Sequence, residues 1–180
     1  DALADRGGGP FQKLRDTASS HDRLFIVEVM GRHTGFLALE VGVASGAEVA
    51  IVPENPFSLG RIVDKLHYSR KRGKTHSMII LAEGVMPAQS LKEALMDTGG
   101  YEARVTVLGH VLRGGSPTSF DTVLASRMGV AAVQALMEGE RGVMVGVCCG
   151  QMKLSPLPVA WEEKKCLNPE LISLIDILSI

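Results

Sequence analysis

The sequence predicts an α/β protein, a three-layer α/β/α fold built on a mainly parallel sheet. Two observations support this prediction. Short, almost continuously apolar segments rich in β-branched residues recur along the chain, and segments with helical spacing of apolar residues alternate with them. Strands that are apolar on both faces are typical of parallel sheets covered by helices on each side.

The first predicted strand covers Leu24 to Met30, which is apolar apart from Glu28. A polar segment, Gly-Arg-His-Thr-Gly at residues 31–35, then interrupts the apolar pattern. A helix is expected next, because one helical face carries Phe36, Leu39, Val43 and Ala47.

The same alternation continues through the middle of the chain. Residues 48–53 and 76–83 predict two further strands. Between them Ser58 is expected to cap a helix whose buried face carries Ile62, Leu66 and Ser69. Residues 88–97 predict another helix.

The last part of the chain predicts a fourth strand at residues 104–110 and a glycine-rich loop at 114–117. A long helix at about 119–137 and an apolar strand at 143–149 follow the loop. The succession of strand and helix therefore extends over most of the sequence.

Composition limits the functional classes. The chain has 180 residues, 46% of them hydrophobic, and a formal charge of −1, which suits one or two globular domains. Nucleic acid and membrane are not expected partners, because both favour a concentrated basic face. No apolar run reaches the roughly eighteen residues of a membrane span and the start does not resemble a signal peptide, so a cytoplasmic location is expected.

Several metal and cofactor sites are not expected. The three cysteines, including the adjacent Cys148 and Cys149, indicate reduced, mostly buried thiols. The five histidines show no zinc-ligand spacing. Gly73-Lys74-Thr75 is not part of a P-loop, because Tyr68 occupies the position of the required earlier glycine. No dinucleotide fingerprint is present.

Charged residues and glycines gather where the predicted strands end. Arg32 follows the first strand, Glu83 the third, and His110 and Arg113 the fourth. Ligands of open α/β sheets bind at this edge, where arginine and histidine can hold phosphate and a carboxylate can accept bonds from hydroxyls. A phosphorylated polyol fits this set. A single arginine at a strand end is more often solvated or in a surface ion pair, and it is the convergence of several such residues that makes a binding site an equal alternative.

Four segments carry a specific resemblance: VEVMGRHTGFLAL, GAEVAIVPE, LAEG and RVTVLGHVLRGGSPTSFDTVLASRMG. In order and separation they resemble the C-terminal part of the 6-phosphofructokinase family, from about Phe11 to Ile180. The resemblance implies a cytoplasmic, Mg²⁺-dependent glycolytic phosphotransferase. Its reaction would transfer a phosphoryl group from ATP to the 1-hydroxyl of fructose 6-phosphate, giving fructose 1,6-bisphosphate. It also implies an allosteric homo-oligomer, a tetramer or a dimer.

The resemblance also implies a substrate site. Its expected residues are Arg23, Met30, Gly31, Arg32, Glu83, Arg104, His110, Val111, Leu112 and Arg113. Within this set His110 and Arg113 would hold the 6-phosphate, and Glu83 the sugar hydroxyls. Arg32 would also stabilise the transition state, which makes it the expected catalytic residue. Arg23 and Arg104 would serve the neighbouring subunit, and His33 takes no implied role.

A second implied site would bind a nucleoside diphosphate or phosphoenolpyruvate as effector. Its expected residues are Arg15, Gly46, Ala47, Glu48, Arg72, Lys74, Thr75 and His76. Arg72 stands where relatives often have lysine. The charge is kept, but arginine and lysine differ in geometry.

The resemblance divides the chain into a small, sugar-binding domain at residues 1–111 and 163–180 and part of a large, donor-binding domain at 112–162. The family's glycine-rich donor segment, magnesium-binding aspartates and catalytic aspartate lie upstream and do not occur here. The irregular start suggests a truncated chain that would not turn over alone. Diphosphate as donor, and a non-catalytic sugar-phosphate-binding or assembly subunit, remain alternatives.

Overall fold

The computed structural model describes residues 24–179, which divide into two compact units. One unit contains residues 24–114 and 167–179, and the other contains residues 115–166. The chain therefore leaves the first unit after Gly114 and returns to it at Leu167, whereas the sequence placed these crossings after residues 111 and 162.

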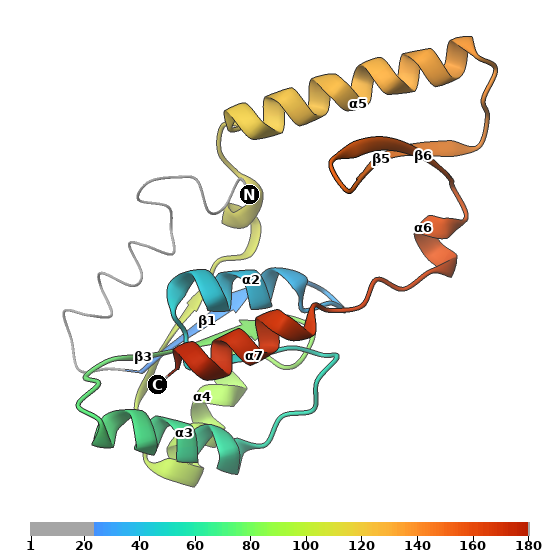
Figure 1. The fold of residues 1–180 in the computed structure, drawn as a ribbon. Helices are drawn as coiled ribbons and strands as arrows, with labels where there is room; N and C mark the ends of the chain where they lie inside the picture. Colours follow the sequence, from blue (N-terminus) through green and yellow to red (C-terminus); the bar gives the residue numbers. More distant parts are fainter. Residues whose placement is uncertain (1–23, 180) are drawn as a thin grey trace. The chain divides into compact units, whose positions relative to one another are not determined.

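A four-stranded parallel sheet forms the centre of the first unit, with strand order β2-β3-β1-β4. Figure 1 labels two of these strands, β1 and β3. Its strands are β1 (Leu24–Val29), β2 (Val49–Ile51), β3 (Ser77–Ala82) and β4 (Ala103–Val107). Val29 of β1 lies opposite Ala82 of β3, and Glu28 lies opposite Val107 of β4. The carboxyl ends of these three neighbouring strands therefore lie side by side, and the predicted parallel sheet is confirmed.

Helices cover both faces of this sheet, as predicted. On one face, α2 (Phe36–Ser45) and α7 (Pro169–Leu178) pack on an apolar cluster that includes Phe25, Val27 and Val29. On the other face, α3 (Leu59–Lys71) and α4 (Ala88–Gly99) pack on Leu24 and Ile26. Because side chains alternate along a strand, β1 is buried on both sides, which explains its nearly continuous apolar sequence.

The second unit contains α5 (Ser119–Met137), the antiparallel hairpin of β5 (Val143–Cys148) and β6 (Gln151–Pro156), and the short α6 (Val159–Glu162). Helix α5 begins with a reciprocal capping box between Thr118 and Asp121, which stabilises its first turn. The strand predicted at 143–149 is present, but it pairs with β6 rather than joining the parallel sheet.

The structure corrects several predicted elements. Strand β4 ends at Val107, and residues Gly109–Arg113 form a 3₁₀ helix, η1. Ser58 occupies the N-cap of α3, but its side chain makes no capping hydrogen bond. Helix α2 ends before Ala47, because Gly46 adopts a left-handed conformation with φ of 66°.

Two further differences concern helix α7 and the thiols. Helix α7 was not predicted, although Asn168 at its N-cap and Pro169 in its first turn are typical start signals. All three cysteines are free but exposed, so the expectation of buried thiols is wrong. Within residues 24–179, no helix combines the length and apolar character needed to cross a membrane.

Candidate functional site

The carboxyl edge of the parallel sheet brings three of the predicted strand ends together. Glu83 follows β3, the segment from Met30 to Arg32 follows β1, and η1 follows β4. These strands are direct neighbours in the sheet, with β1 between the other two. The fold therefore brings expected sugar-phosphate residues from three separate parts of the sequence, other than Arg23 and Arg104, to one edge.

Arg32 lies in a tight turn at the end of β1. Its φ is 49°, in the left-handed region that non-glycine residues occupy at a cost of about 1–3 kcal/mol. The turn is closed by the backbone N–H of Thr34, which donates to the carbonyl of Gly31 over 2.8 Å. The Thr34 hydroxyl donates to the same oxygen over 3.0 Å.

Glu83 holds this turn in place. Its Oε1 accepts a hydrogen bond from the backbone N–H of Arg32 at 2.9 Å and a longer one from Gly31 at 3.3 Å. Its own N–H donates to the carbonyl of Val29 at 3.0 Å. In the part of the chain that the structure describes, Oε2 makes no hydrogen bond. One carboxylate oxygen thus fixes the turn, and the other can accept a bond from a ligand.

Two glycines allow the close approach of the turn to the loop after β3. A Cβ added to Gly84 would lie 1.5 Å from the carbonyl oxygen of Arg32. A Cβ added to Gly31 would lie 2.3 Å from the carbonyl oxygen of Thr34. Neither position can hold a side chain without movement of the backbone, so the turn requires glycine at both.

A second carboxylate at the same edge was missed from the sequence. Oε1 of Glu54 accepts a hydrogen bond from the backbone N–H of Gly35, the N-cap of α2, at 2.9 Å. Glu54 follows β2. Since ligands of open α/β sheets bind at the carboxyl ends of the strands, the sequence alone could have indicated this residue as well. It fixes the far end of the segment that begins with Arg32.

His110 and Arg113 are presented by η1. Both are exposed, whereas Leu112 between them is half-buried against the core on the α2 face of the sheet. The backbone N–H of Leu108, at the N-cap of η1, donates to the carbonyl of Glu28 over 3.0 Å and joins η1 to β1. Val111 is 65% exposed.

The two arginines at this edge can bind an anion. Among residues 24–179, neither Arg32 nor Arg113 takes part in an ion pair. Both guanidinium groups are exposed and available to a ligand. Planar guanidinium groups bind phosphate oxygens through paired hydrogen bonds, so this edge can hold a phosphorylated molecule.

Two expected substrate residues do not join this cluster. Arg104 is exposed and pairs with Phe25 near the amino end of β1, three residues before β4 ends at Val107. A strand rises by roughly 3.3 Å per residue, so a residue three positions before the end of β4 lies away from the carboxyl edge. Arg23 lies outside the described residues.

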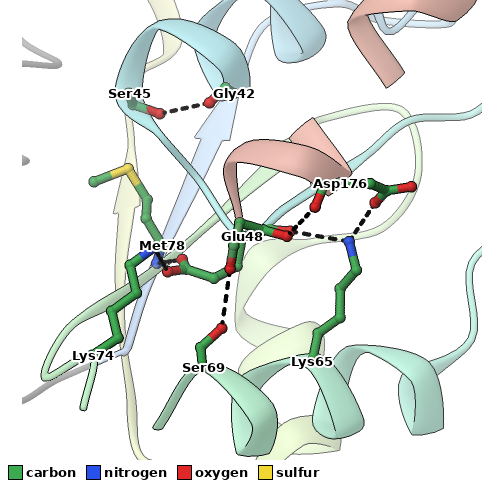
Figure 2. Close-up of polar contacts among 9 residues, drawn as sticks. Gly42, Ser45, Glu48, Lys65, Ser69, Lys74, Met78 and Asp176 are labelled. Carbon is green, nitrogen blue, oxygen red and sulfur yellow. Dashed lines mark hydrogen bonds and ion pairs between the residues drawn. The ribbon is translucent and has the colours of Figure 1, made fainter. Parts of the chain in front are cut away.

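The expected effector residues are partly assembled at the opposite, amino edge of the sheet. Gly46, Glu48, Lys74 and His76 line a pocket of about 310 Å³. Glu48 is only 1% exposed, and Figure 2 shows its carboxylate between Lys74 and the backbone of Met78. The Lys74 ammonium lies 2.5 Å from Oε1, and Oε2 accepts a bond from the Met78 N–H.

The remaining effector candidates are placed differently. Ala47 is fully buried and does not line the pocket, Arg15 lies outside the described residues, and Arg72 donates to the hydroxyl of Tyr68 at 3.3 Å. Thr75 lines a neighbouring pocket that also contains Tyr101. There burial raises the pKa of the Tyr101 hydroxyl above its ordinary value, and the nearby Arg70 charge opposes this shift.

Comparison with known proteins gives consistent matches. The phosphofructokinase family model matches residues 10–136. The chain is 50% identical over 170 residues to ATP-dependent 6-phosphofructokinase 1 of Thermus thermophilus. It is 51% identical over 168 residues to ATP-dependent 6-phosphofructokinase of Listeria welshimeri. In both cases the match covers 93% of this chain and 53% of the relative.

A solved structure of phosphofructokinase from Saccharomyces cerevisiae matches with a TM-score of 0.75 and 34% identity. That match covers 82% of this chain and 21% of the yeast chain. The present chain thus spans about half the length of the curated relatives it matches, and a smaller share of the yeast protein.

Proposed function

The chain belongs to the phosphofructokinase family, and we propose that it forms the fructose 6-phosphate site of an ATP-dependent 6-phosphofructokinase. The observation that carries the proposal is the convergence of Arg32, Arg113 and Glu83 at one sheet edge. The names of the curated relatives favour ATP over diphosphate as the donor.

In this proposal Arg113 and His110 bind the 6-phosphate, whose charge is near −2. Hydrogen bonds to charged groups contribute roughly 1.5–3 kcal/mol each, so η1 supplies much of the affinity for the sugar phosphate. The half-buried Leu112 and the bond from Leu108 to Glu28 hold η1 in position before the substrate arrives. Little conformational entropy is then lost in ordering the η1 segment when the substrate binds.

Glu83 and Arg32 act on the sugar and the transferring phosphoryl group. Oε2 of Glu83 accepts a hydrogen bond from a sugar hydroxyl, while Oε1 keeps the Arg32 turn closed. Arg32, together with Met30 and Gly31, lines the sugar. Its guanidinium stabilises the negative charge that the phosphoryl oxygens carry in the transition state.

The family's Mg²⁺ does not fit the residues described. Among them, no group of three or more His, Cys, Asp or Glu side chains could hold a metal ion. Oε1 of Glu83 is also already committed to the Arg32 turn. We therefore propose that Mg²⁺ and ATP are bound by parts of the whole protein outside these residues.

Regulation and assembly form a further part of the proposal. Gly46, Glu48, Lys74 and His76 contribute to an effector site for a nucleoside diphosphate or phosphoenolpyruvate, in a pocket that already exists. Arg104, which lies away from the carboxyl edge, serves the substrate of a neighbouring subunit in a cytoplasmic homotetramer or dimer.

A coupled assay of ADP release tests the activity. The full-length protein should release ADP only when ATP and fructose 6-phosphate are both present, and replacing ATP by diphosphate should abolish product formation. The 180-residue chain alone should give no turnover. Fructose 6-phosphate binding without turnover by the full-length protein would instead favour the non-catalytic alternative.

A further inference from the structure

The tip of the β5–β6 hairpin carries two adjacent thiols. Cys148 ends β5 and pairs with Gln151 of β6, so Cys149 and Gly150 form the two-residue turn between the strands. Both turn residues have positive φ, 50° for Cys149 and 79° for Gly150. This is the pattern of a type I′ turn, which favours asparagine, aspartate or glycine at the first position. The turn therefore does not explain why Cys149 is a cysteine.

The turn is held by a contact from the neighbouring helix. Nη2 of Arg127 on α5 donates a hydrogen bond to the carbonyl of Gly150 at 3.0 Å. The hairpin ladder continues from the turn through the pair of Val147 and Met152. The two thiols thus lie on consecutive residues of a backbone that is held by the β5–β6 ladder and by α5.

Both thiols are exposed and free. Two sulfur donors on consecutive residues can bind one soft atom at the same time. After the first bond forms, the second thiol is present at a high effective concentration, which can raise affinity by about 10²–10⁴ over a single thiol. Within residues 24–179, no further His, Cys, Asp or Glu side chains complete a group of three with them.

Two thiolates without a third protein ligand suit a soft centre that needs two sulfur bonds from the protein. We propose that Cys148 and Cys149 form a dithiol binding site for trivalent organic arsenicals. An arsenical R–As=O would react with both thiols to give R–As(S-Cys)₂. The two thiol protons leave with the oxygen as one water, and arsenic stays trivalent, so no oxidant or reductant is needed.

The test uses phenylarsine oxide, the full 180-residue chain and intact-mass measurement. Cys166, the third exposed cysteine, supplies a matched control. The unsubstituted chain and Cys166→Ser should each take up one equivalent. That adduct should survive excess glutathione, a monothiol, and be released by dithiothreitol, a dithiol. Cys148→Ser and Cys149→Ser should each retain the arsenical about a hundredfold more weakly.

Folding of each variant is checked by its thermal unfolding transition. If Cys149→Ser unfolds differently, Cys149→Asn replaces it, because asparagine is favoured at this turn position. Equal retention by the unsubstituted chain and the Cys148 and Cys149 variants would overturn the proposal. Loss of the adduct in Cys166→Ser, or no uptake by the folded chain, would overturn it as well.

Discussion

The backbone N–H of Arg32 donates to Oε1 of Glu83 over 2.9 Å, so a side chain at the end of β3 fixes the turn at the end of β1. The bond supports a left-handed conformation that arginine would otherwise avoid. Because the turn is already formed, the backbone from which the Arg32 side chain projects is fixed before a ligand binds. Preorganisation of this kind is what electrostatic stabilisation of a transition state requires.

The close contact beneath this turn gives the first prediction. Gly84→Ala would place a Cβ 1.5 Å from the Arg32 carbonyl oxygen, so the turn must move. We expect a loss of about 1–3 kcal/mol in the free energy of unfolding, measured by urea denaturation. Fructose 6-phosphate binding by the full-length protein should weaken with it.

Gly60→Ala on α3 is the matched control. An added Cβ there meets only the Ser58 hydroxyl, at 3.7 Å. Alanine is favoured over glycine within helices by roughly 0.5–1 kcal/mol, so this variant should be as stable as the parent or more so. A similar loss of stability in both variants would show that the contact at Gly84 is unimportant.

Two ion pairs among residues 24–114 and 167–179 should differ in strength. Glu48 is 1% exposed, and Lys74→Met would leave its carboxylate buried without a counter-charge, so the free energy of unfolding should fall by about 3 kcal/mol. The pair of Lys65 with Asp176 is exposed, with side chains 37% and 64% accessible, and Lys65→Met should cost less than about 1 kcal/mol.

The double variant Glu48→Gln with Lys74→Met tests whether the buried, unpaired charge of Glu48 causes the loss of stability. Since glutamine carries no charge, the double variant should recover much of the stability lost in Lys74→Met alone. Urea titrations that give the same loss for Lys65→Met and Lys74→Met would contradict this explanation.

Helix α5 exposes a set of large apolar side chains. They include Val130 at 59%, Val133 at 56%, Leu136 at 71% and Met137 at 82% exposure. Apolar surface of this kind favours association, so the 180-residue chain should form oligomers at micromolar concentration in sedimentation velocity. Val133→Asp with Leu136→Lys should shift it towards monomer. A monomeric parent chain with sharp cooperative unfolding would be evidence against this prediction.

If the full-length protein has the proposed activity, substitutions of Arg32 and Arg104 should have different kinetic effects. Arg32→Ala should lower kcat together with kcat/KM, because the proposed contact strengthens in the transition state. Arg104→Ala should raise the half-saturating concentration of fructose 6-phosphate and change its cooperativity, since it is proposed to serve a neighbouring subunit. Steady-state kinetics with each substrate varied in turn provide the measurement. Equal effects on the ATP KM in both variants would mean that these residues act on the donor.

The parallel sheet could be predicted because its central strands, β1 and β3, are buried on both faces, which leaves runs such as Leu24 to Val29 almost wholly apolar. The hairpin partner β6 could not be predicted in the same way. Its sequence, Gln151–Pro156, has no apolar run and instead alternates polar and apolar residues up to Ser155, which is the pattern of a half-exposed strand and was overlooked. The exposure of Cys148 was missed because cysteine is commonly buried, and a hairpin tip is an exception that depends on tertiary structure.

The site could be predicted to the level of strand ends, since parallel neighbours necessarily bring Glu83 and Arg32 to one edge. The hydrogen bond between them could not, because it depends on the left-handed turn at Arg32. The 3₁₀ helix that presents Arg113 could not be predicted either. The apolar sequence of β4 continues past Val107, so the sequence does not show where the strand ends.

The most direct test of the proposed site is calorimetric titration of fructose 6-phosphate into the full-length protein and two of its arginine variants. Arg113→Ala should raise the Kd by about ten- to a hundredfold, because the variant loses one or two hydrogen bonds to the charged phosphate. Arg70→Ala, which removes the same charge from the amino edge of the sheet beside Leu24 and Ser77, should leave the Kd unchanged. An unchanged Kd in Arg113→Ala, or equal weakening in both variants, would contradict the assignment of the carboxyl edge to the sugar phosphate.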